Sequence, residues 1–336
     1  MKGMNMKQWA ADQIAADKKK AIPVLSFPAV SLLDISVEEL ISNAATQAKG
    51  MEMIAERVDS GAVFSMMNLS LEAEAFGSEI VIQDGEVPTV YGSILKNEED
   101  AKNLVVPEVG AARTGLYIET IEHVLDTITD RPVFAGVIGP FSLAGRLMDV
   151  AEILINCITE PDFVNITMRK TTDFLKEYIR AYKEIGANGV VIAEPLTGLL
   201  SADLADEFST PYMKEIVDEL QDDNFMIIYH NCGNYVLYMI DTMLKTGAMG
   251  YHFGNVIEMR DMMPHIPEDI IAMGNIDPAT AFKNGTPASV YEKTTSVLKD
   301  CAKYPNFIIS SGCDIPPKTK WSNIDSFFKA VRDFYS

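Results

Sequence analysis

Short apolar runs alternate with longer amphipathic segments along this chain, a pattern typical of parallel strands joined by helices. Eight runs are predicted to be buried strands, at 21–27, 61–67, 132–140, 188–195, 225–230, 249–255, 269–278 and 307–313. The segments between them predict helices, several of which begin at capping or proline signals, at 36–57, 141–157, 161–185, 235–244, 287–302 and 322–334. The alternation therefore predicts an α/β fold.

Eight strand–helix units in 336 residues predict a single parallel (β/α)8 TIM barrel, because right-handed crossovers close eight such units into a ring. A doubly wound open sheet is the alternative. The barrel is favoured because no G-x-G-x-x-G follows the first run and polar candidates end many different runs. Residues 1–20 predict an N-terminal helical extension that caps one end, and 21–336 the barrel catalytic domain, with an excursion at about 78–119.

Two runs end in residues that suit a shared metal ion. His230 and Cys232 end one run at alternate positions, so an extended chain points both side chains to the same side, and Cys313 ends another run. One imidazole and two thiolates form a soft ligand set that tetrahedral Zn²⁺ accepts while one position stays open for chemistry. The competing interpretation is that all three are core residues, since free cysteine is among the most buried residue types. The metal site requires two neighbouring strand tips to bring them together.

Four further polar residues follow or end strands. Glu72 and Glu74 come directly after the second run, where they are either a ligand or base with its helper, or the acidic first turn of a helix. Glu194 ends the fourth run, as a polar contact at an active face or as an ordinary cap, and His252 ends the sixth. Because strand-end residues line the active face of a barrel, these four are candidate catalytic residues.

Composition limits the classes of partner. Asp and Glu number 48 against 28 Lys and Arg, which gives a formal charge of −20. This excess disfavours nucleic acid and anionic membranes as partners, and solubility alone also accounts for it. No apolar run is long enough to span a membrane, and the first residues lack an apolar signal core, so the chain is expected in the cytoplasm. Its four cysteines fit that reducing compartment.

Several stretches carry a resemblance to a known family. They are 68–77, 138–144, 230–234 with its H-x-C, and 273–278 running on to the C-D-I-P-P of 313–317. In this order they resemble the uroporphyrinogen decarboxylase superfamily, and within it the corrinoid-dependent methyltransferases that include methylcobamide:coenzyme M methyltransferases. The resemblance implies a TIM barrel of the uroporphyrinogen decarboxylase type in which His230, Cys232 and Cys313 bind zinc.

The resemblance also implies an activity, a zinc-dependent transfer of a methyl group between a corrinoid (cobalamin-type) protein and a small thiol or other acceptor or donor. It further implies that zinc activates the substrate and that a separate partner protein carries the corrinoid. Glu72, Glu74, Glu194 and His252 are then candidates for the fourth ligand, for the group that accepts the thiol proton, or for orienting a ligand. The direction of transfer stays open at this point.

One departure separates this chain from uroporphyrinogen decarboxylase itself. In that family member, the first strand is followed by a pattern similar to R-Q-A-G-R, whose guanidinium groups hold the carboxylates of a tetrapyrrole. Here the corresponding residues 27–31 read F-P-A-V-S, and the first arginine of the chain is Arg57. A tetrapyrrole decarboxylase is therefore the alternative enzyme, and a non-catalytic corrinoid-binding module is the alternative from another class.

Overall fold

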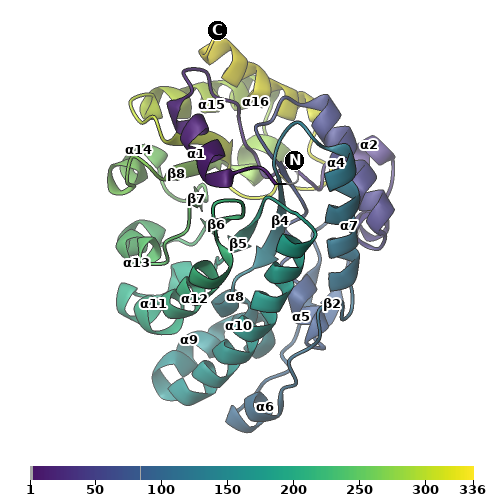
Figure 1. Cartoon of the computed structure of the whole chain (residues 1–336), viewed down its shortest axis with the longest axis vertical. Helices are drawn as coiled ribbons and strands as arrows, with labels where there is room; N and C mark the ends of the chain where they lie inside the picture. The colour runs from purple at the N-terminus through teal and green to yellow at the C-terminus, as the bar shows by residue number, and fades with distance from the viewer. Residues whose placement is uncertain (1–2, 84) are drawn as a thin grey trace.

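The computed structural model describes residues 3–83 and 85–336 and is organised around one curled parallel sheet (Figure 1). Seven strands follow one another in the order β1-β4-β5-β6-β7-β8-β9, all neighbours being parallel. They are β1 Val63–Phe64, β4 Val133–Ile138, β5 Gly189–Ala193, β6 Met226–Asn231, β7 Gly250–Phe253, β8 Ile271–Ile276 and β9 Phe307–Ser311. The predicted barrel is confirmed as a TIM-barrel-like fold with a curled sheet of seven parallel strands.

The extended segment 21–27 stands where an eighth strand would close the ring. The Ile22 N–H donates to the Ile309 carbonyl at 3.0 Å, and the Ala21 carbonyl accepts from the Gly61 N–H at 3.0 Å. The segment therefore bridges the last strand and the residues that lead into the first.

A regular strand was predicted at 21–27, and that prediction is wrong for a local reason. Pro23 has no N–H to donate to a sheet. The next donor, Val24 N–H, binds the Ser311 hydroxyl at 3.0 Å instead of a backbone carbonyl. The segment consequently closes the barrel through isolated hydrogen bonds instead of a regular ladder.

Helices surround the sheet (Figure 1). They are α1 Met6–Ala15, α2 Ala29–Leu33, α3 Val37–Ile41, α4 Ala44–Arg57, α5 Leu71–Ala75, α6 Glu98–Asn103, α7 Thr114–Thr127, α8 Pro140–Met148, α9 Val150–Thr159, α10 Pro161–Glu184, α11 Ala202–Phe208, α12 Thr210–Leu220, α13 Ile240–Leu244, α14 Met259–Met262, α15 Pro287–Cys301 and α16 Trp321–Phe334.

Two predicted helices are each divided in two. The one at 36–57 becomes α3 and α4, because Asn43 adopts an extended conformation and accepts from Thr46 N–H as a new N-cap. The one at 141–157 becomes α8 and α9, because Asp149 has φ 99° and caps α9 through Ala151 N–H. Within the predicted excursion, β2 Glu79–Val81 and β3 Thr89–Tyr91 form an antiparallel hairpin.

The barrel interior is filled by inward-facing strand residues, among them Phe64, Phe134 and Ile228. Met6 and Trp9 of α1 join this interior cluster, with the Trp9 and Phe134 rings 6.1 Å apart. Trp9 and Phe134 make this contact near the amino end of β4, so α1 closes that end of the barrel. The opposite end, at the carboxyl ends of the strands, is where a barrel of this kind is expected to carry its active site.

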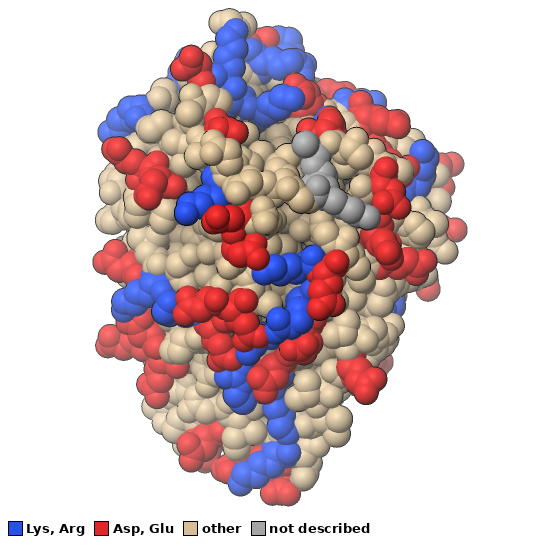
Figure 2. Space-filling view, in the orientation of Figure 1, with Lys and Arg blue, Asp and Glu red and all other residues tan. Residues whose placement is uncertain are grey.

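On the face shown in Figure 2, Lys and Arg lie interspersed with Asp and Glu. Part of this mixture is an ion-pair network between α10 and α12, in which Arg169 and Lys176 both contact Glu215. Among the described residues no helix combines the length and the apolar character needed to cross a membrane.

Candidate functional site

The three predicted metal ligands lie where two strands end. His230 is the penultimate residue of β6, Cys232 follows that strand directly, and Cys313 comes just after β9. Because β7 and β8 separate β6 from β9 in the sheet, the prediction of neighbouring strand tips is wrong. The side chains nevertheless meet: Cys232 hydrogen-bonds with Cys313, and His230 interacts with Cys313.

The two thiols of this cluster hold their protons unequally. The hydrogen bond with Cys313 lowers the pKa of Cys232 below its ordinary value. The same bond, together with burial, raises the pKa of Cys313 well above the ordinary value. Cys232 therefore ionises first, with the Cys313 thiol as donor, and a thiolate is the form that binds a metal. Burial raises the pKa of Cys157 and of Cys301 to about 12, so both of these remain thiols.

His230 is held at one ring nitrogen and unpartnered at the other. It is 2% exposed. Its Nδ1 lies 3.2 Å from the His252 carbonyl oxygen and 2.7 Å from His252 Nδ1, whereas its Nε2 is buried without any hydrogen-bond partner. A buried polar atom without a partner is costly unless a ligand meets it.

The cluster supplies the donors of a zinc site without a preformed coordination shell. One imidazole nitrogen without a partner and two sulfur atoms match the preference of Zn²⁺. Within residues 3–83 and 85–336, no three His, Cys, Asp or Glu side chains are positioned to hold a metal ion as they stand. The donor set fits zinc, and binding requires these side chains to turn toward a common point.

Glycine is required beside Cys232. A Cβ added to Gly254, just after β7, would lie 2.4 Å from the Cys232 Cβ. On the other side of this loop, a Cβ added to Gly233 would lie 2.4 Å from the Gly198 Cα. Backbone therefore packs directly on backbone around Cys232, which fixes the path of the loop that carries the thiol.

Of the four predicted catalytic residues, His252 is the one that the structure brings against this cluster. Its Nδ1 contacts His230, and its Nε2 lies 2.8 Å from the Ser310 hydroxyl. Burial lowers the pKa of His252 well below its ordinary value, and the neighbouring His230 adds to this effect. A neutral imidazole at this place orients its neighbour and carries no charge.

Glu194 caps a helix. Its Oε1 accepts from Phe141 N–H at 2.8 Å, and its Oε2 accepts from the N–H and hydroxyl of Ser142 at 2.9 and 2.7 Å. Thr197 also donates to Oε2, at 3.2 Å. Burial raises the pKa of Glu194 to about 7 despite these bonds. The carboxyl therefore fastens the start of α8 to the end of β5, whereas the cap considered from the sequence was for the segment that follows Glu194.

Glu72 and Glu74 are neighbours on α5 with different surroundings. Glu74 is partly exposed and forms an ion pair with Arg113 at 2.7 Å. Glu72 is 1% exposed; its Oε1 accepts from Ile138 N–H at 3.0 Å, and its Oε2 has no partner. Burial raises the pKa of Glu72 to about 7. Of the three predicted carboxyl groups, Glu72 is therefore the one with a buried oxygen that lacks a hydrogen-bond partner.

Two further polar residues near the cluster were not predicted as site residues. Asp314 accepts from the Ser26 hydroxyl at 2.5 Å and from Met67 N–H at 3.1 Å, and burial raises its pKa to about 7. Asp314 therefore ties three chain segments together beside Cys313. Ser310 supports His252, and its signal in the sequence is a polar residue two positions after Ile308, on the inward face of an apolar strand.

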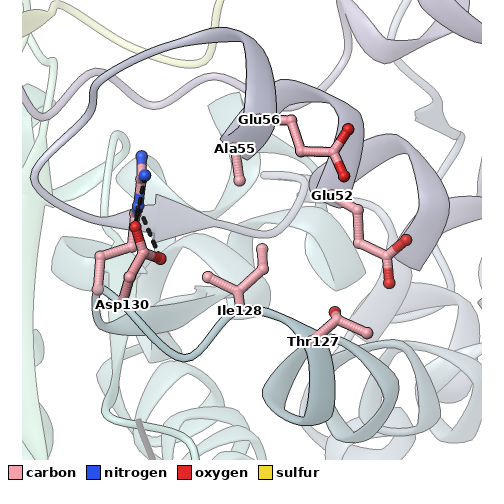
Figure 3. Close-up of a pocket in the computed structure, with 7 residues that line it drawn as sticks. Glu52, Ala55, Glu56, Thr127, Ile128 and Asp130 are labelled. Carbon is pink, nitrogen blue, oxygen red and sulfur yellow. Dashed lines mark hydrogen bonds and ion pairs between the residues drawn. The ribbon is translucent and has the colours of Figure 1, made fainter.

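A separate cavity of about 390 Å³ lies where α4 and α7 end (Figure 3). Glu52 and Glu56 of α4 line it together with Thr127, Ile128 and the Asp130–Arg131 pair. These helix ends lead into β1 and β4, so the cavity is at the amino end of the barrel. In this fold that end serves stability, and catalysis uses the other one.

Comparison with known proteins places these observations in context. The model of the family described as "Uroporphyrinogen decarboxylase (URO-D)" matches residues 29–334. The methylcobamide:CoM methyltransferase MtbA of Methanosarcina acetivorans is 28% identical over 327 residues, which cover 93% of this chain and 94% of that protein. The uroporphyrinogen decarboxylase of Hydrogenovibrio crunogenus is 24% identical over 83% of this chain and 80% of that protein.

A solved structure extends the likeness to three dimensions. A methyltransferase from Methanosarcina mazei superposes with a TM-score of 0.85 at 21% sequence identity, over 99% of this chain and 100% of that one. At this identity the match concerns the fold. The curled sheet and its ring of helices are therefore shared along the full length of both chains.

Proposed function

The chain belongs to the uroporphyrinogen decarboxylase family, and within it we propose a zinc-dependent methyltransferase that exchanges a methyl group between a corrinoid on a partner protein and a small thiol or other acceptor or donor. The observation that carries this proposal is the meeting of His230, Cys232 and Cys313, with one imidazole nitrogen left without a partner. Similarity to a methylcobamide:CoM methyltransferase along nearly the whole chain supports the same class.

The side chains of the cluster have properties that favour binding of a cation. When bound to His230, Cys232 and Cys313, zinc would supply stabilisation of a substrate thiolate at neutral pH. Cys232 gives up its proton readily because Cys313 donates to it, and burial keeps water away from His230. In the direction that methylates a thiol, the substrate sulfur would form a bond to the methyl carbon as the methyl group leaves the partner's corrinoid, and the electron pair of the broken bond would stay with the corrinoid.

Among the predicted carboxyls, Glu72 has the properties of a proton acceptor, but its side chain interacts with Tyr117, Tyr178 and Tyr182, so we propose no direct proton transfer to it from a thiol at the cluster. Glu72 has one oxygen without a partner and a pKa raised to about 7, which suits a general base at neutral pH. Glu194 is less suited because its oxygens already accept several hydrogen bonds. Glu74 is occupied by Arg113.

The corrinoid-carrying partner is proposed to dock over the ends of the strands. Tyr235 and Tyr238, which follow β6, are 54% and 82% exposed, and Val256, which follows β7, is 49% exposed. Exposed aromatic side chains are enriched at protein interfaces. Tyr235 and Tyr238 come from the segment after β6 that also holds Cys232, and Val256 comes from the segment after β7, so a protein bound there would bring its cofactor to the cluster.

A tetrapyrrole decarboxylase is less well supported, although decarboxylases are among the relatives. Residues 27–31 contain no arginine, and Phe27, Ala29 and Val30 are buried. The first arginine, Arg57, is paired with Asp325 at 2.7 Å. The guanidinium groups that would hold several carboxylates are therefore missing from this segment.

Metal analysis and a half-reaction assay test the proposal. The purified protein should contain about one zinc per chain, and Cys232→Ala or Cys313→Ala should remove it. Cys157→Ala and Cys301→Ala are matched controls, because both thiols are buried in helices away from the cluster. Full zinc content in either cluster variant would contradict the ligand assignment.

The direction of transfer is read from the corrinoid spectrum. Methylated corrinoid is mixed with thiols, and reduced corrinoid is mixed with methylated compounds, each with the zinc-loaded protein. Demethylation or methylation that depends on Cys232 identifies the half-reaction. If the zinc-loaded protein changes neither spectrum with any acceptor or donor, the methyltransferase assignment is wrong.

A further inference from the structure

The protons on the paired histidines can be located from their contacts. The Nδ1 atoms of His230 and His252 are 2.7 Å apart, so one must carry a hydrogen and the other must present a lone pair. Two arrangements satisfy this contact. In one, His230 donates to His252; in the other, His252 donates to His230.

A backbone carbonyl selects between the two arrangements. The His252 carbonyl oxygen lies 3.2 Å from His230 Nδ1, and an oxygen of this kind can only accept. If His230 Nδ1 carries the hydrogen, this oxygen and the His252 ring share it. If it does not, the lone pair of Nδ1 faces a lone pair of the carbonyl oxygen, and the hydrogen moves to buried Nε2, where the Cys313 sulfur that interacts with this ring is at best a weak acceptor.

We infer that His230 is fixed as the tautomer protonated at Nδ1, and that His252 and Ser310 are the positioning residues that fix it. His252 then presents its Nδ1 lone pair to His230 and carries its hydrogen on Nε2, which donates to the Ser310 hydroxyl over 2.8 Å. The chain of contacts runs from β9 through β7 to β6. Its purpose rests on the proposed function, because it leaves the Nε2 lone pair of His230 free for a cation.

Ser310 is the residue through which this inference can be tested without removing an imidazole. In Ser310→Ala, a hydrogen on His252 Nε2 would lose the hydroxyl as acceptor and keep the contact of the His252 ring with the Ser311 backbone, so the balance would shift toward His252 protonated at Nδ1 and donating to His230. His230 Nε2 would then carry the hydrogen and could not bind a metal until it lost it. Ser310→Thr keeps the hydroxyl, and Ser311→Ala removes a neighbouring buried hydroxyl that bonds to Val24.

The primary measurement is a long-range ¹H–¹⁵N correlation spectrum of the metal-free protein labelled at histidine, which separates protonated from bare ring nitrogens. The four histidines are assigned from single His→Gln variants. The wild type, Ser310→Thr and Ser311→Ala should show His230 protonated at Nδ1 and His252 at Nε2. Ser310→Ala should move both protons. A wild-type His230 protonated at Nε2, or a Ser310→Ala spectrum like that of the wild type, would overturn the inference.

A second measurement follows zinc affinity by competition with a chelator. Ser310→Ala should bind zinc about 10–100-fold more weakly than the wild type, the usual effect of losing a residue that orients a metal ligand. Ser310→Thr should recover most of the affinity, and Ser311→Ala should match the wild type. Equal loss in Ser310→Ala and Ser311→Ala would reduce Ser310 to a packing role. If the wild type binds no zinc, the proposed function fails while the tautomer result stands by itself.

Discussion

Replacing Glu72 by glutamine should change how the stability of the protein depends on pH. The folded protein raises the pKa of Glu72 to about 7 from an ordinary value of 4.5, because burial penalises the charged form. The unfolded chain therefore ionises this carboxyl at a lower pH than the folded chain does. As the pH rises from 4.5 to 7, the free energy of unfolding falls, and it levels off above 7.

The size of this effect follows from the shift. A difference of 2.5 pKa units, 7 minus 4.5, corresponds to about 3 kcal/mol at 1.36 kcal/mol per unit. About 2 kcal/mol of it falls between pH 5.5 and 8, which keeps the experiment above the isoelectric region. The glutamine oxygen can still accept from Ile138 N–H. Its buried NH₂ lacks a partner, which costs about 1–3 kcal/mol at every pH and leaves the pH dependence unaffected.

Urea unfolding of the wild type and Glu72→Gln at several pH values between 5.5 and 8 measures this difference. Relative to the wild type, the variant should gain about 2 kcal/mol of stability across that range. Glu74→Gln, which removes a carboxylate from the same helix at a partly exposed position, is the control for the loss of one charge. A constant difference between Glu72→Gln and the wild type at all pH values would refute the idea that burial holds this carboxyl neutral.

Three further substitutions test other parts of the structure. Trp9→Ala should lower the free energy of unfolding by about 3–5 kcal/mol in denaturant titrations, because it empties the closed end of the barrel, whereas the exposed Asp12→Ala on the same helix should change it little. Gly254→Ala should lower zinc affinity at least about tenfold in chelator competition, because its Cβ would press on Cys232, and unchanged affinity would contradict the close packing described. Tyr238→Ala should leave zinc content intact and weaken turnover only with the corrinoid protein as partner, so an equal loss with free methylcobalamin would rule out a docking role.

The order of elements could be predicted from the sequence because burial on both faces of a strand leaves a plain apolar signature. Six of the seven strands of the parallel sheet lie within predicted runs, and β6 extends one residue beyond the run at 225–230. The run at 21–27 is as apolar as the seven strands but does not form a regular hydrogen-bond ladder. Pro23 has no N–H to donate, and Val24 N–H binds the Ser311 hydroxyl instead of a backbone carbonyl. Helix division at Asp149 was also missed, because φ 99° in a residue other than glycine has no signature in an apolar pattern.

The site was accessible to sequence reasoning only in part. Alternation along β6 correctly places His230 among the inward residues, yet nothing in the sequence shows that the barrel mouth brings β9 to β6 past two strands. Glu194 could be identified as a strand-end carboxylate, but its role as a cap depends on where α8 begins in space. Ser310 is an example of a residue that the sequence does not single out. Its role depends on the contact with the ring nitrogen of His252, which only the folded structure shows.

The barrel interior changes from apolar to polar along its axis, and this change determines the surroundings of the cluster. In β6, Met226 and Ile228 join the apolar interior, and the next inward residue is His230. These apolar residues and the burial of the cluster exclude water, so the His252 imidazole is neutral, and one nitrogen of His230 lacks a hydrogen-bond partner. A cation held there would restore that missing contact and would find thiols whose protons are already unequally shared. The same apolar packing that stabilises the barrel therefore makes an empty cluster costly and a metal-bound one favourable, which is why we expect zinc to raise the stability of the wild type but not that of Cys232→Ala.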